Sequence, residues 1–265
     1  KDILPVEYYE SKPGQIRQRN MGISKLDDKT KLVATMDDDV TYFEGAIKEV
    51  IDYWNSLDLE TAGVGFNVTN CPAHKHTWFK YIMGFSVPSA GKILRSGWIT
   101  PITNISENIS AEYLNGGTTV WRQEILKNNL NEVINNPWAV IEDIMFSYPI
   151  GKKYPLYVCS KSKVDIEDII IDDLPNKFYF NRGRAFYLQS LYFIKKNPEL
   201  SVFYFLINKM NHCIWMILDS IVSLNKNNYY FGSGILSGFF DSVKFLLRIE
   251  KINSYKSRCV DYITD

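Results

Sequence analysis

The sequence predicts an α/β sandwich that is followed by a helical region. Short apolar runs typical of buried strands alternate with helical patterns through the first 180 residues, and one such run ends abruptly at three aspartates. From residue 182 to residue 247, aromatic and aliphatic residues recur at helical spacing with few turn signals. We therefore predict an α/β domain over residues 1–180 and a helical, aromatic-rich region over residues 181–265.

The first half of the α/β domain is predicted to alternate helix and strand. Residues 31–36 form a compact apolar run, KLVATM, that is short enough for a buried strand. Apolar residues then recur at intervals of three and four after Thr41, which forms a helix-start signature with Glu44. The predicted elements are a helix over residues 15–26, a strand over 31–36, a helix over 41–54 and a strand over 62–68.

The second half of this domain continues the alternation. A strand-like stretch over residues 113–120 passes through Gly116 and Gly117 into a predicted helix over residues 122–127. Residues 138–148 then show a helical pattern that carries Glu142 and Asp143, and residues 156–159 form the next predicted strand.

Balanced charge and scattered cysteines narrow the classes of function. Lysine plus arginine and aspartate plus glutamate number 30 each, so no overall charge recruits a nucleic acid, and we expect no nucleic-acid partner. The four cysteines show no metal-finger spacing, which favours reduced thiols in the cytoplasm. The pair of histidines in CPAHKH (residues 71–76) lacks a second ligand pair, which favours a structural role over a zinc site.

The apolar stretches of the helical region are too short to span a membrane. Lys209, His212 and Asp219 interrupt them before they reach the roughly 18–20 apolar residues that a spanning helix needs. These helices are therefore expected to pack on the α/β domain or to lie in a membrane interface. The expected location is cytoplasmic, with peripheral contact on the cytoplasmic face of the membrane through these helices.

Three consecutive carboxylates, Asp37, Asp38 and Asp39, follow the strand predicted over residues 31–36. Adjacent carboxylates repel one another, and Mg²⁺ or Mn²⁺ would relieve this repulsion while binding the phosphate oxygens of a substrate. The alternative is a solvated turn that caps the following helix. An EF-hand calcium loop is excluded, because Tyr42 and Lys48 stand where that loop needs glycine and glutamate.

Four segments in order resemble the bacterial family-2 glycosyltransferases. They are KPGQIRQRNMGI (residues 12–23), LVATMDDDVTYFEGAI (residues 32–47), NGGTTVWRQEIL (residues 115–126) and IEDIMFSYPI (residues 141–150). In that family a Gly-x-x-x-x-Arg-Asn-x-Gly helix precedes the strand with the acidic motif, and a glycine pair and a Glu-Asp segment follow. Four ordered motifs are far more specific than the acidic triplet alone.

The resemblance implies a GT-A fold, a Rossmann-like mixed-sheet sandwich, with the helical region at its C-terminus. It implies transfer of a sugar, with inversion, from a nucleotide-diphosphate sugar to a glycan or lipid-linked acceptor in cell-surface polysaccharide or glycolipid synthesis. Family members begin with a strand and turn that hold the nucleobase. Because nothing before Lys12 resembles that segment, the fold is expected to be incomplete at its N-terminus.

The resemblance also implies roles for single residues. Asp38 would contact the sugar side of the donor, and Asp37 and Asp39 would hold Mn²⁺ or Mg²⁺. Asp143 would be the general base that deprotonates the acceptor hydroxyl, with Glu142 the second choice. The remaining candidates are Arg17 and Arg19 beside the nucleotide, and Gly116 and Gly117, which either let the backbone approach the sugar or form a tight turn.

Two other interpretations remain open. The run MDDDVT also fits the start of haloacid-dehalogenase-type phosphatases, with Asp37 as nucleophile, Asp39 as acid and base, and IIIDDLP (residues 169–175) as the later acidic pair. That interpretation leaves the other three segments unexplained and finds no convincing lysine motif. The third possibility is an inactive or interaction protein.

Overall fold

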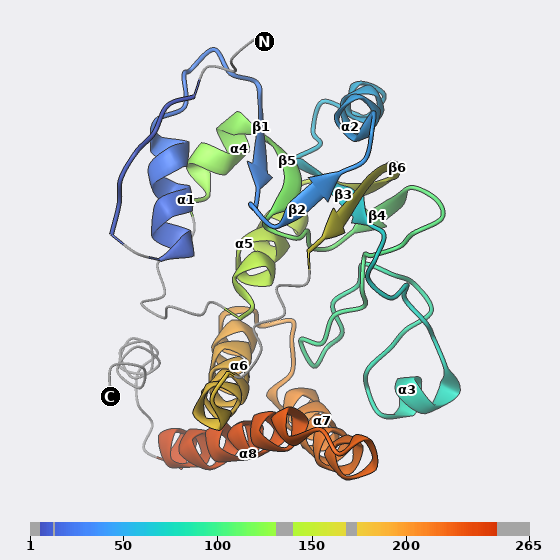
Figure 1. Cartoon of the computed structure of the whole chain (residues 1–265), viewed down its shortest axis with the longest axis vertical. Coiled ribbons are helices and arrows are strands. Elements are labelled where there is room, and N and C mark those ends of the chain that lie inside the picture. The colour runs from blue at the N-terminus through green and yellow to red at the C-terminus, as the bar shows by residue number, and fades with distance from the viewer. Residues whose placement is uncertain (1–5, 13, 131–139, 168–173, 248–265) are drawn as a thin grey trace.

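The computed structural model describes residues 6–12, 14–130, 140–167 and 174–247, and it is a mixed α/β structure with a mixed sheet and several helices (Figure 1). The strands are β1 (Leu32–Met36), β2 (Val40–Tyr42), β3 (Gly63–Val68), β4 (Ile109–Ala111), β5 (Thr118–Arg122) and β6 (Leu156–Ile166). The helices are α1 (Gln15–Ser24), α2 (Ala46–Asn55), α3 (Trp78–Ile82), α4 (Gln123–Asn128), α5 (Glu142–Gly151), α6 (Asn176–Lys196), α7 (Val202–Ser223) and α8 (Lys226–Leu247).

The described strands form one sheet in the order β1-β5-β3-β6-β2, with β4 paired to β6. Strands β3 and β6 are parallel, and the other pairings are antiparallel. Strand β3 lies at the centre and all six of its residues are buried, as expected for a strand covered on both faces. The first and second strands in sequence therefore lie at opposite ends of the strand order.

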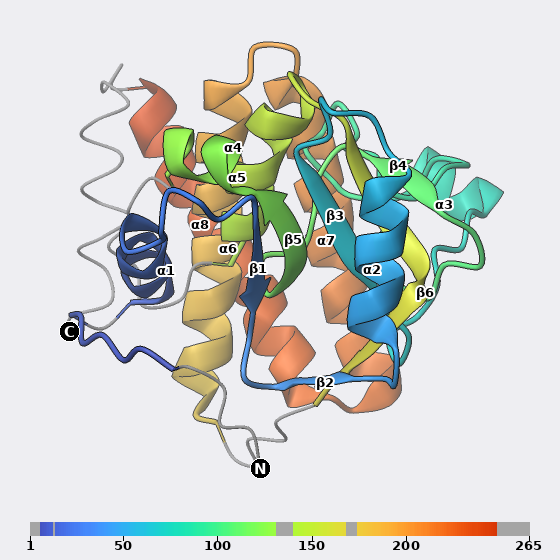
Figure 2. The same cartoon turned by 90° about the horizontal axis from the view of Figure 1, so that it is seen from above.

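Helices cover both faces of the sheet, and Figure 2 shows α2 and α5 on opposite sides of it. On one face, Val50 and Trp54 of α2 pack against Val64 and Phe66 of β3. On the other face, a second apolar core joins the sheet to α4 and α5, and its members include Trp121, Leu126, Phe146 and Ile150. Because apolar cores cover both faces of the sheet, the ends of β1 and β5 are held in fixed positions relative to α5.

The three C-terminal helices form their own core below the sheet (Figure 1). Helices α6 and α8 pack closely because glycines lie at their contact: a Cβ atom on Gly183 would overlap the backbone of Phe231, and one on Gly234 would overlap that of Phe180. Tyr148 of α5 is buried in the same core, so the helical region is packed directly against the α/β part.

Most predicted elements are present, but several bounds differ: the strand predicted over residues 113–120 is β5 at Thr118–Arg122, and the strand predicted over residues 156–159 runs on to Ile166. The helix predicted from Thr41 begins at Ala46, because Val40–Tyr42 pair with the end of β6 and form β2. Strand β1 is not fully buried: Ala34 and Met36 are exposed, since β1 pairs only with β5 among the described strands. Residues 138 and 139 of the helix predicted over 138–148 lie outside the described residues.

Helix α6 begins at Asn176 and so runs across the boundary expected near Asn181. The division into a catalytic domain over 1–180 and a helical region over 181–265 stays a prediction. Across the described residues, no helix combines the length and the apolar character needed to cross a membrane.

Candidate functional site

Three carboxylates from two distant segments meet around one guanidinium, that of Arg19. Arg19 of α1 lies 3.3 Å from Glu142, 3.5 Å from Asp37 and 3.7 Å from Asp143, measured between nitrogen and carboxylate oxygen. The Arg19 side chain is 11% exposed and that of Glu142 is 5% exposed, whereas Asp37 and Asp143 are more than a third exposed. The site therefore has a buried side, Arg19 and Glu142, and a side that faces solvent.

The local sequence of each segment places these side chains. In α1, Ile16 and Ile23 are buried, and Arg19 stands three and four residues from them on the same helix face. Asp37 directly follows β1, where its backbone N–H donates to the carbonyl of Gly117 at 3.0 Å. Glu142 and Asp143 occupy the first turn of α5, where the helix dipole favours negative charge.

Gly116 and Gly117 make room for two of the carboxylates. A Cβ atom on Gly116 would overlap the carboxylate of Asp143 and lie 2.7 Å from Nη1 of Arg19. A Cβ atom on Gly117 would overlap the carboxylate of Asp37. The glycine pair thus allows both acids to approach the backbone, and the Gly116 N–H donates a hydrogen bond to Asp143.

A serine fastens α5 to the segment that precedes the glycines. Ser147 is fully buried, and its Oγ accepts from the Leu114 backbone N–H at 3.0 Å. The same hydroxyl lies 2.6 Å from the carbonyl of Asp143, one turn earlier in α5. These two hydrogen bonds fix the first turn of α5 relative to the segment that leads into the glycine pair.

The carboxylates of this cluster hold their protons more tightly than ordinary ones. Burial, and after it the charge of Asp143, raises the pKa of Glu142 to about 7 against the opposing charge of Arg19. Burial also raises the pKa of Asp143, against the hydrogen bond from Gly116 and the charge of Arg19. Burial raises the pKa of Asp37, and Arg19 again opposes it. A carboxyl group whose pKa is raised toward 7 can both accept and release a proton near neutral pH, which suits proton transfer.

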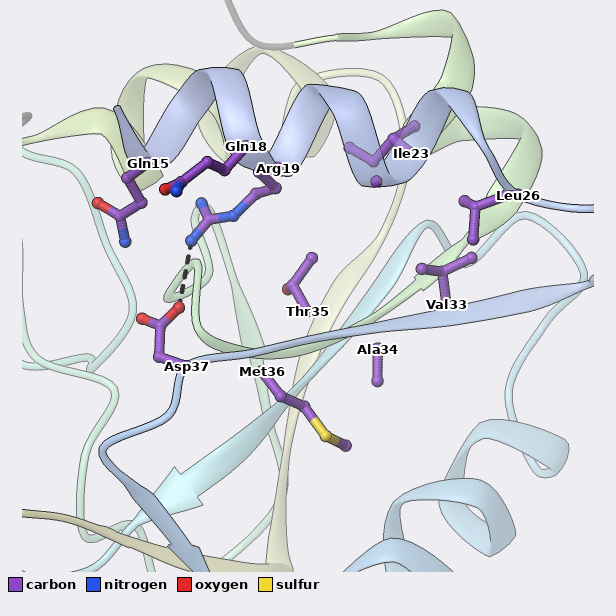
Figure 3. Close-up of a pocket in the computed structure, with 11 residues that line it drawn as sticks. Gln15, Gln18, Arg19, Ile23, Leu26, Val33, Ala34, Thr35, Met36 and Asp37 are labelled. Atoms are coloured by element: carbon purple, nitrogen blue, oxygen red, sulfur yellow. Dashed lines mark ion pairs between the residues drawn. The ribbon is translucent and has the colours of Figure 1, made fainter. Parts of the chain in front are cut away.

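A cavity of about 440 Å³ lies between α1 and β1, beside this cluster (Figure 3). Figure 3 shows Arg19 reaching down from α1 to Asp37 at one end of the cavity, where Gln15 and Gln18 also lie. The other end is apolar and is lined by Ile23, Leu26 and Val33. The cavity thus joins a charged end to an apolar end, as ligand sites commonly do.

Of the other predicted site residues, Asp38 and Asp39 lie in the turn after β1, and Arg17 lies on α1. Asp38 is exposed in the turn between β1 and β2. Asp39 is half-buried in the same turn, and its carbonyl accepts from the Glu167 N–H at 2.7 Å. Both acids act on Asp37 through their charge. Arg17 is half-buried on α1.

The donor set for a metal ion is small. Nowhere in the described ranges do three or more histidine, cysteine, aspartate or glutamate side chains gather in a group that could hold a metal ion. Asp37 and Asp39 offer carboxylates within one turn, which fits Mg²⁺ or Mn²⁺ held by one or two carboxylates together with substrate phosphates. In CPAHKH, His74 lies 2.7 Å from the Val87 carbonyl and His76 lies 2.8 Å from the Ser86 hydroxyl.

Tyr42 is a site residue that the sequence pattern did not single out. Its hydroxyl is buried and makes no hydrogen bond within the described part of the chain. Burial raises the pKa of Tyr42, and the charge of Asp37 raises it further. Its position three residues after the acidic triplet was the available signal, but residues 41–54 were predicted as one helix.

The later acidic pair of the phosphatase interpretation, Asp172 and Asp173, lies outside the described residues. Comparison of the sequence with protein-family models and with curated proteins finds no match. The function of this chain is therefore argued from the geometry and chemistry of its own site.

Proposed function

We propose that this chain is a metal-dependent glycosyltransferase of the family-2, GT-A type, which transfers a sugar with inversion from a nucleotide-diphosphate sugar to an acceptor hydroxyl. The mixed sheet and the helices on both of its faces are compatible with that fold. The single observation that carries the proposal is the meeting of four separate sequence motifs at Arg19.

That meeting is informative because the motifs are far apart in the sequence. The arginine helix, the acidic triplet, the glycine pair and the Glu-Asp segment were selected by pattern alone, and one residue from each lies against another in space. A chance acidic turn would need no guanidinium behind it and no glycine pair beside it. The cluster combines carboxylates, a fixed cation and an adjacent cavity, and active sites that transfer a group between two substrates use these features.

Asp143 is the proposed general base. It is the more exposed member of the Glu142–Asp143 pair, so it is the one that can reach an acceptor. It would take the proton of the acceptor hydroxyl while that oxygen forms its bond to the anomeric carbon. The bond from that carbon to the diphosphate breaks at the same time, and the leaving oxygen keeps the electron pair.

Glu142 and Arg19 are proposed as positioning residues. Glu142 is buried against Arg19, and its carboxylate has little contact with solvent. It therefore orients the guanidinium rather than the substrate. Arg19 in turn stands between Asp37 and Asp143 and fixes their separation. Its positive charge also favours binding of an anionic donor.

The proposed cofactor is Mn²⁺ or Mg²⁺, with Asp37 and Asp39 as its protein ligands. When bound with the diphosphate, the ion supplies positive charge against the negative charge that develops on the leaving group. Asp38, exposed in the same turn, is proposed to contact the sugar side of the donor, and a glycan or lipid-linked hydroxyl compound is the proposed acceptor.

The test is release of nucleoside diphosphate from a panel of nucleotide sugars, with Mn²⁺ and octyl glycosides as acceptors. We expect release that depends on acceptor and on Mn²⁺. Asp143→Asn should lower the rate by about 10²–10⁴-fold, the usual worth of a general base. Asp39→Asn should remove the dependence on Mn²⁺ and should also weaken the Mn²⁺-dependent binding of nucleoside diphosphate in calorimetry.

The matched control is Asp52→Asn, since Asp52 lies on α2 in an exposed pair with Lys48. It should leave the rate unchanged. Release that persists in Asp143→Asn contradicts the assignment of the base. If phosphate esters are hydrolysed instead, and Asp37→Asn abolishes that hydrolysis, the phosphatase interpretation replaces this one. A folded chain without either activity favours the interaction protein.

A further inference from the structure

A stripe of exposed apolar side chains runs along the whole of α7. Its members recur at intervals of three and four residues, so they share one face of the helix. Phe203 is 66% exposed and Ile221 is 65% exposed, and the stripe residues between them are 39–55% exposed. The stripe comprises Phe203, Ile207, Met210, Ile214, Leu218 and Ile221.

Helix α3 extends this stripe sideways. Trp78 is 76% exposed, and Phe79 and Ile82 are also exposed. The α3 segment is fixed to α7, because Asn211 donates to the Met83 carbonyl at 3.1 Å and the rings of Phe79 and Trp215 lie 6.4 Å apart. In Figure 1, α3 and α7 lie toward the same end of the molecule. The stripe and the exposed residues of α3 are called here the α3–α7 surface.

An apolar cavity of about 570 Å³ borders the α3–α7 surface beside α3. Phe79 of the surface lines this cavity together with Trp215 of α7, and Phe85 and Trp98 line it more deeply. Its lining is mostly apolar, so it suits a hydrocarbon chain better than a polar ligand. A folded protein rarely exposes so many large apolar side chains on one face unless that face binds something.

The charges around this surface are basic. Lys75 and Lys80 are exposed beside the cavity, Arg95 stacks over the Tyr204 ring at 5.1 Å, and Lys226 is exposed where α8 begins. Helices α3 and α7 together carry a single carboxylate, Asp219, and it accepts a hydrogen bond from Asn228 at 2.6 Å. An apolar face bordered by basic groups and by tryptophan and tyrosine side chains is complementary to an anionic lipid surface.

We propose that the α3–α7 surface docks on an anionic lipid bilayer, with α7 lying in the plane of the interface. A second copy of the chain suits this surface less well, because two-fold packing would bring basic borders together. This proposal does not depend on the transferase activity, and vesicle binding can be measured without donor or acceptor.

The test is co-sedimentation of the full chain with vesicles of phosphatidylcholine alone and of phosphatidylcholine mixed with phosphatidylglycerol. We expect the chain to pellet with the mixed vesicles and to bind the neutral ones more weakly. Ile214→Asp, which places a charge at the centre of the stripe, should weaken binding to mixed vesicles by about tenfold or more. Lys80→Gln should reduce binding to the mixed vesicles alone.

Ile47→Asp is the matched control. Ile47 is 46% exposed on α2, against 49% for Ile214, so both variants add the same charge at an equally exposed helical position. Ile47→Asp should bind like the wild type. The proposal is overturned if the wild type stays in the supernatant with both vesicles, or if Ile214→Asp binds equally well. It is also overturned if light scattering finds a dimer that Ile214→Asp separates while vesicle binding is absent.

Discussion

Nη1 of Arg19 lies 3.3 Å from Oε1 of Glu142, although 123 positions separate these residues in the sequence. Both side chains are largely buried, and the other oxygen of Glu142 is buried without a hydrogen-bond partner among the described residues. Arg19 therefore balances the negative charge of the buried Glu142 carboxylate. It also balances part of the charge of the more exposed Asp37 and Asp143. This one guanidinium links the stability of the fold to the geometry of the proposed site.

Replacing Arg19 with methionine should destabilise the chain at pH 7.5. The change leaves Glu142 buried beside two other carboxylates with no cation between them, which we expect to cost about 2–4 kcal/mol of unfolding free energy. Urea unfolding measures the loss. Protonation of the carboxyl groups should recover part of it at pH 5. Lys48→Met removes an exposed helical ion pair and should leave the midpoint unchanged; equal midpoints for Arg19→Met and wild type would contradict the role of Arg19.

Adding a methyl group at Gly117 should disturb the site more than the fold. A Cβ atom there overlaps the Asp37 carboxylate, which must rotate away, and lies 2.8 Å from the Asp37 Cβ, a contact that only a small shift of the local backbone can relieve. We expect Gly117→Ala to stay folded and to lose about 10²-fold in nucleoside diphosphate release, the cost of a displacement on the order of 1 Å. Gly116→Ala should act similarly through Asp143.

Gly22→Ala is the folding control for this pair, because a Cβ atom there meets open space on α1. It should raise the unfolding free energy by about 0.5–1 kcal/mol, the usual gain on replacing glycine in a helix. If Gly117→Ala unfolds the chain, or retains full activity, the glycine pair does not serve to seat the carboxylates.

The pKa of Glu142, raised to about 7 by burial, makes stability depend on pH in a defined window. Because the folded state holds this proton more tightly than the unfolded state, stability is full below about pH 4.5 and falls as the pH rises to about 7. The loss should be about 3 kcal/mol, because each pKa unit corresponds to about 1.4 kcal/mol. Urea unfolding between pH 5 and 8 should show this slope, and Glu142→Gln should flatten it. Glu112→Gln, at a carboxylate paired with Lys92, should keep the wild-type slope, and a slope unchanged in Glu142→Gln would contradict the assignment.

Elements with local signals could be predicted from the sequence. The apolar spacing of α1 and the short run of β1 reveal both elements within about two residues of their observed ends. The start of α2 could not be predicted, because Thr41 forms a valid helix-start signature with Glu44 and is nevertheless held in β2 by pairing with Asp165. A distant partner overrode the local preference there.

The candidate site shows the same division between local and distant signals. Sequence motifs selected Arg19, Asp37, Gly116 and Asp143, but no local pattern shows that the arginine faces three carboxylates. The pattern suggested that the glycines either approach a sugar or form a turn, whereas in the structure they make room for acids from two other segments. Residue types could thus be predicted, and their mutual contacts required the fold.

Lys209 should make the stability of the fold rise with pH, opposite to the effect of Glu142 and at higher pH. Its side chain is buried, with Nζ 3.7 Å from the Phe186 ring centroid and 5.3 Å from that of Trp98, and burial lowers its pKa to about 7. His212 faces the same rings, and burial, followed by the charge of Lys209, lowers its pKa to about 3. The apolar aromatic rings around both groups make their charged forms unfavourable.

The unfolded chain therefore binds more protons than the folded chain between about pH 7 and pH 10, and stability should rise with pH across this range. Lys209→Met keeps the length of the side chain and removes its charge. It should raise the unfolding free energy at pH 7 by about 2 kcal/mol and abolish the rise with pH. Lys196→Met, at an exposed lysine over the Tyr192 ring, should do neither. If Lys209→Met is instead less stable at pH 7, the rings hold a charged ammonium there, and cation–π attraction outweighs the cost of burial.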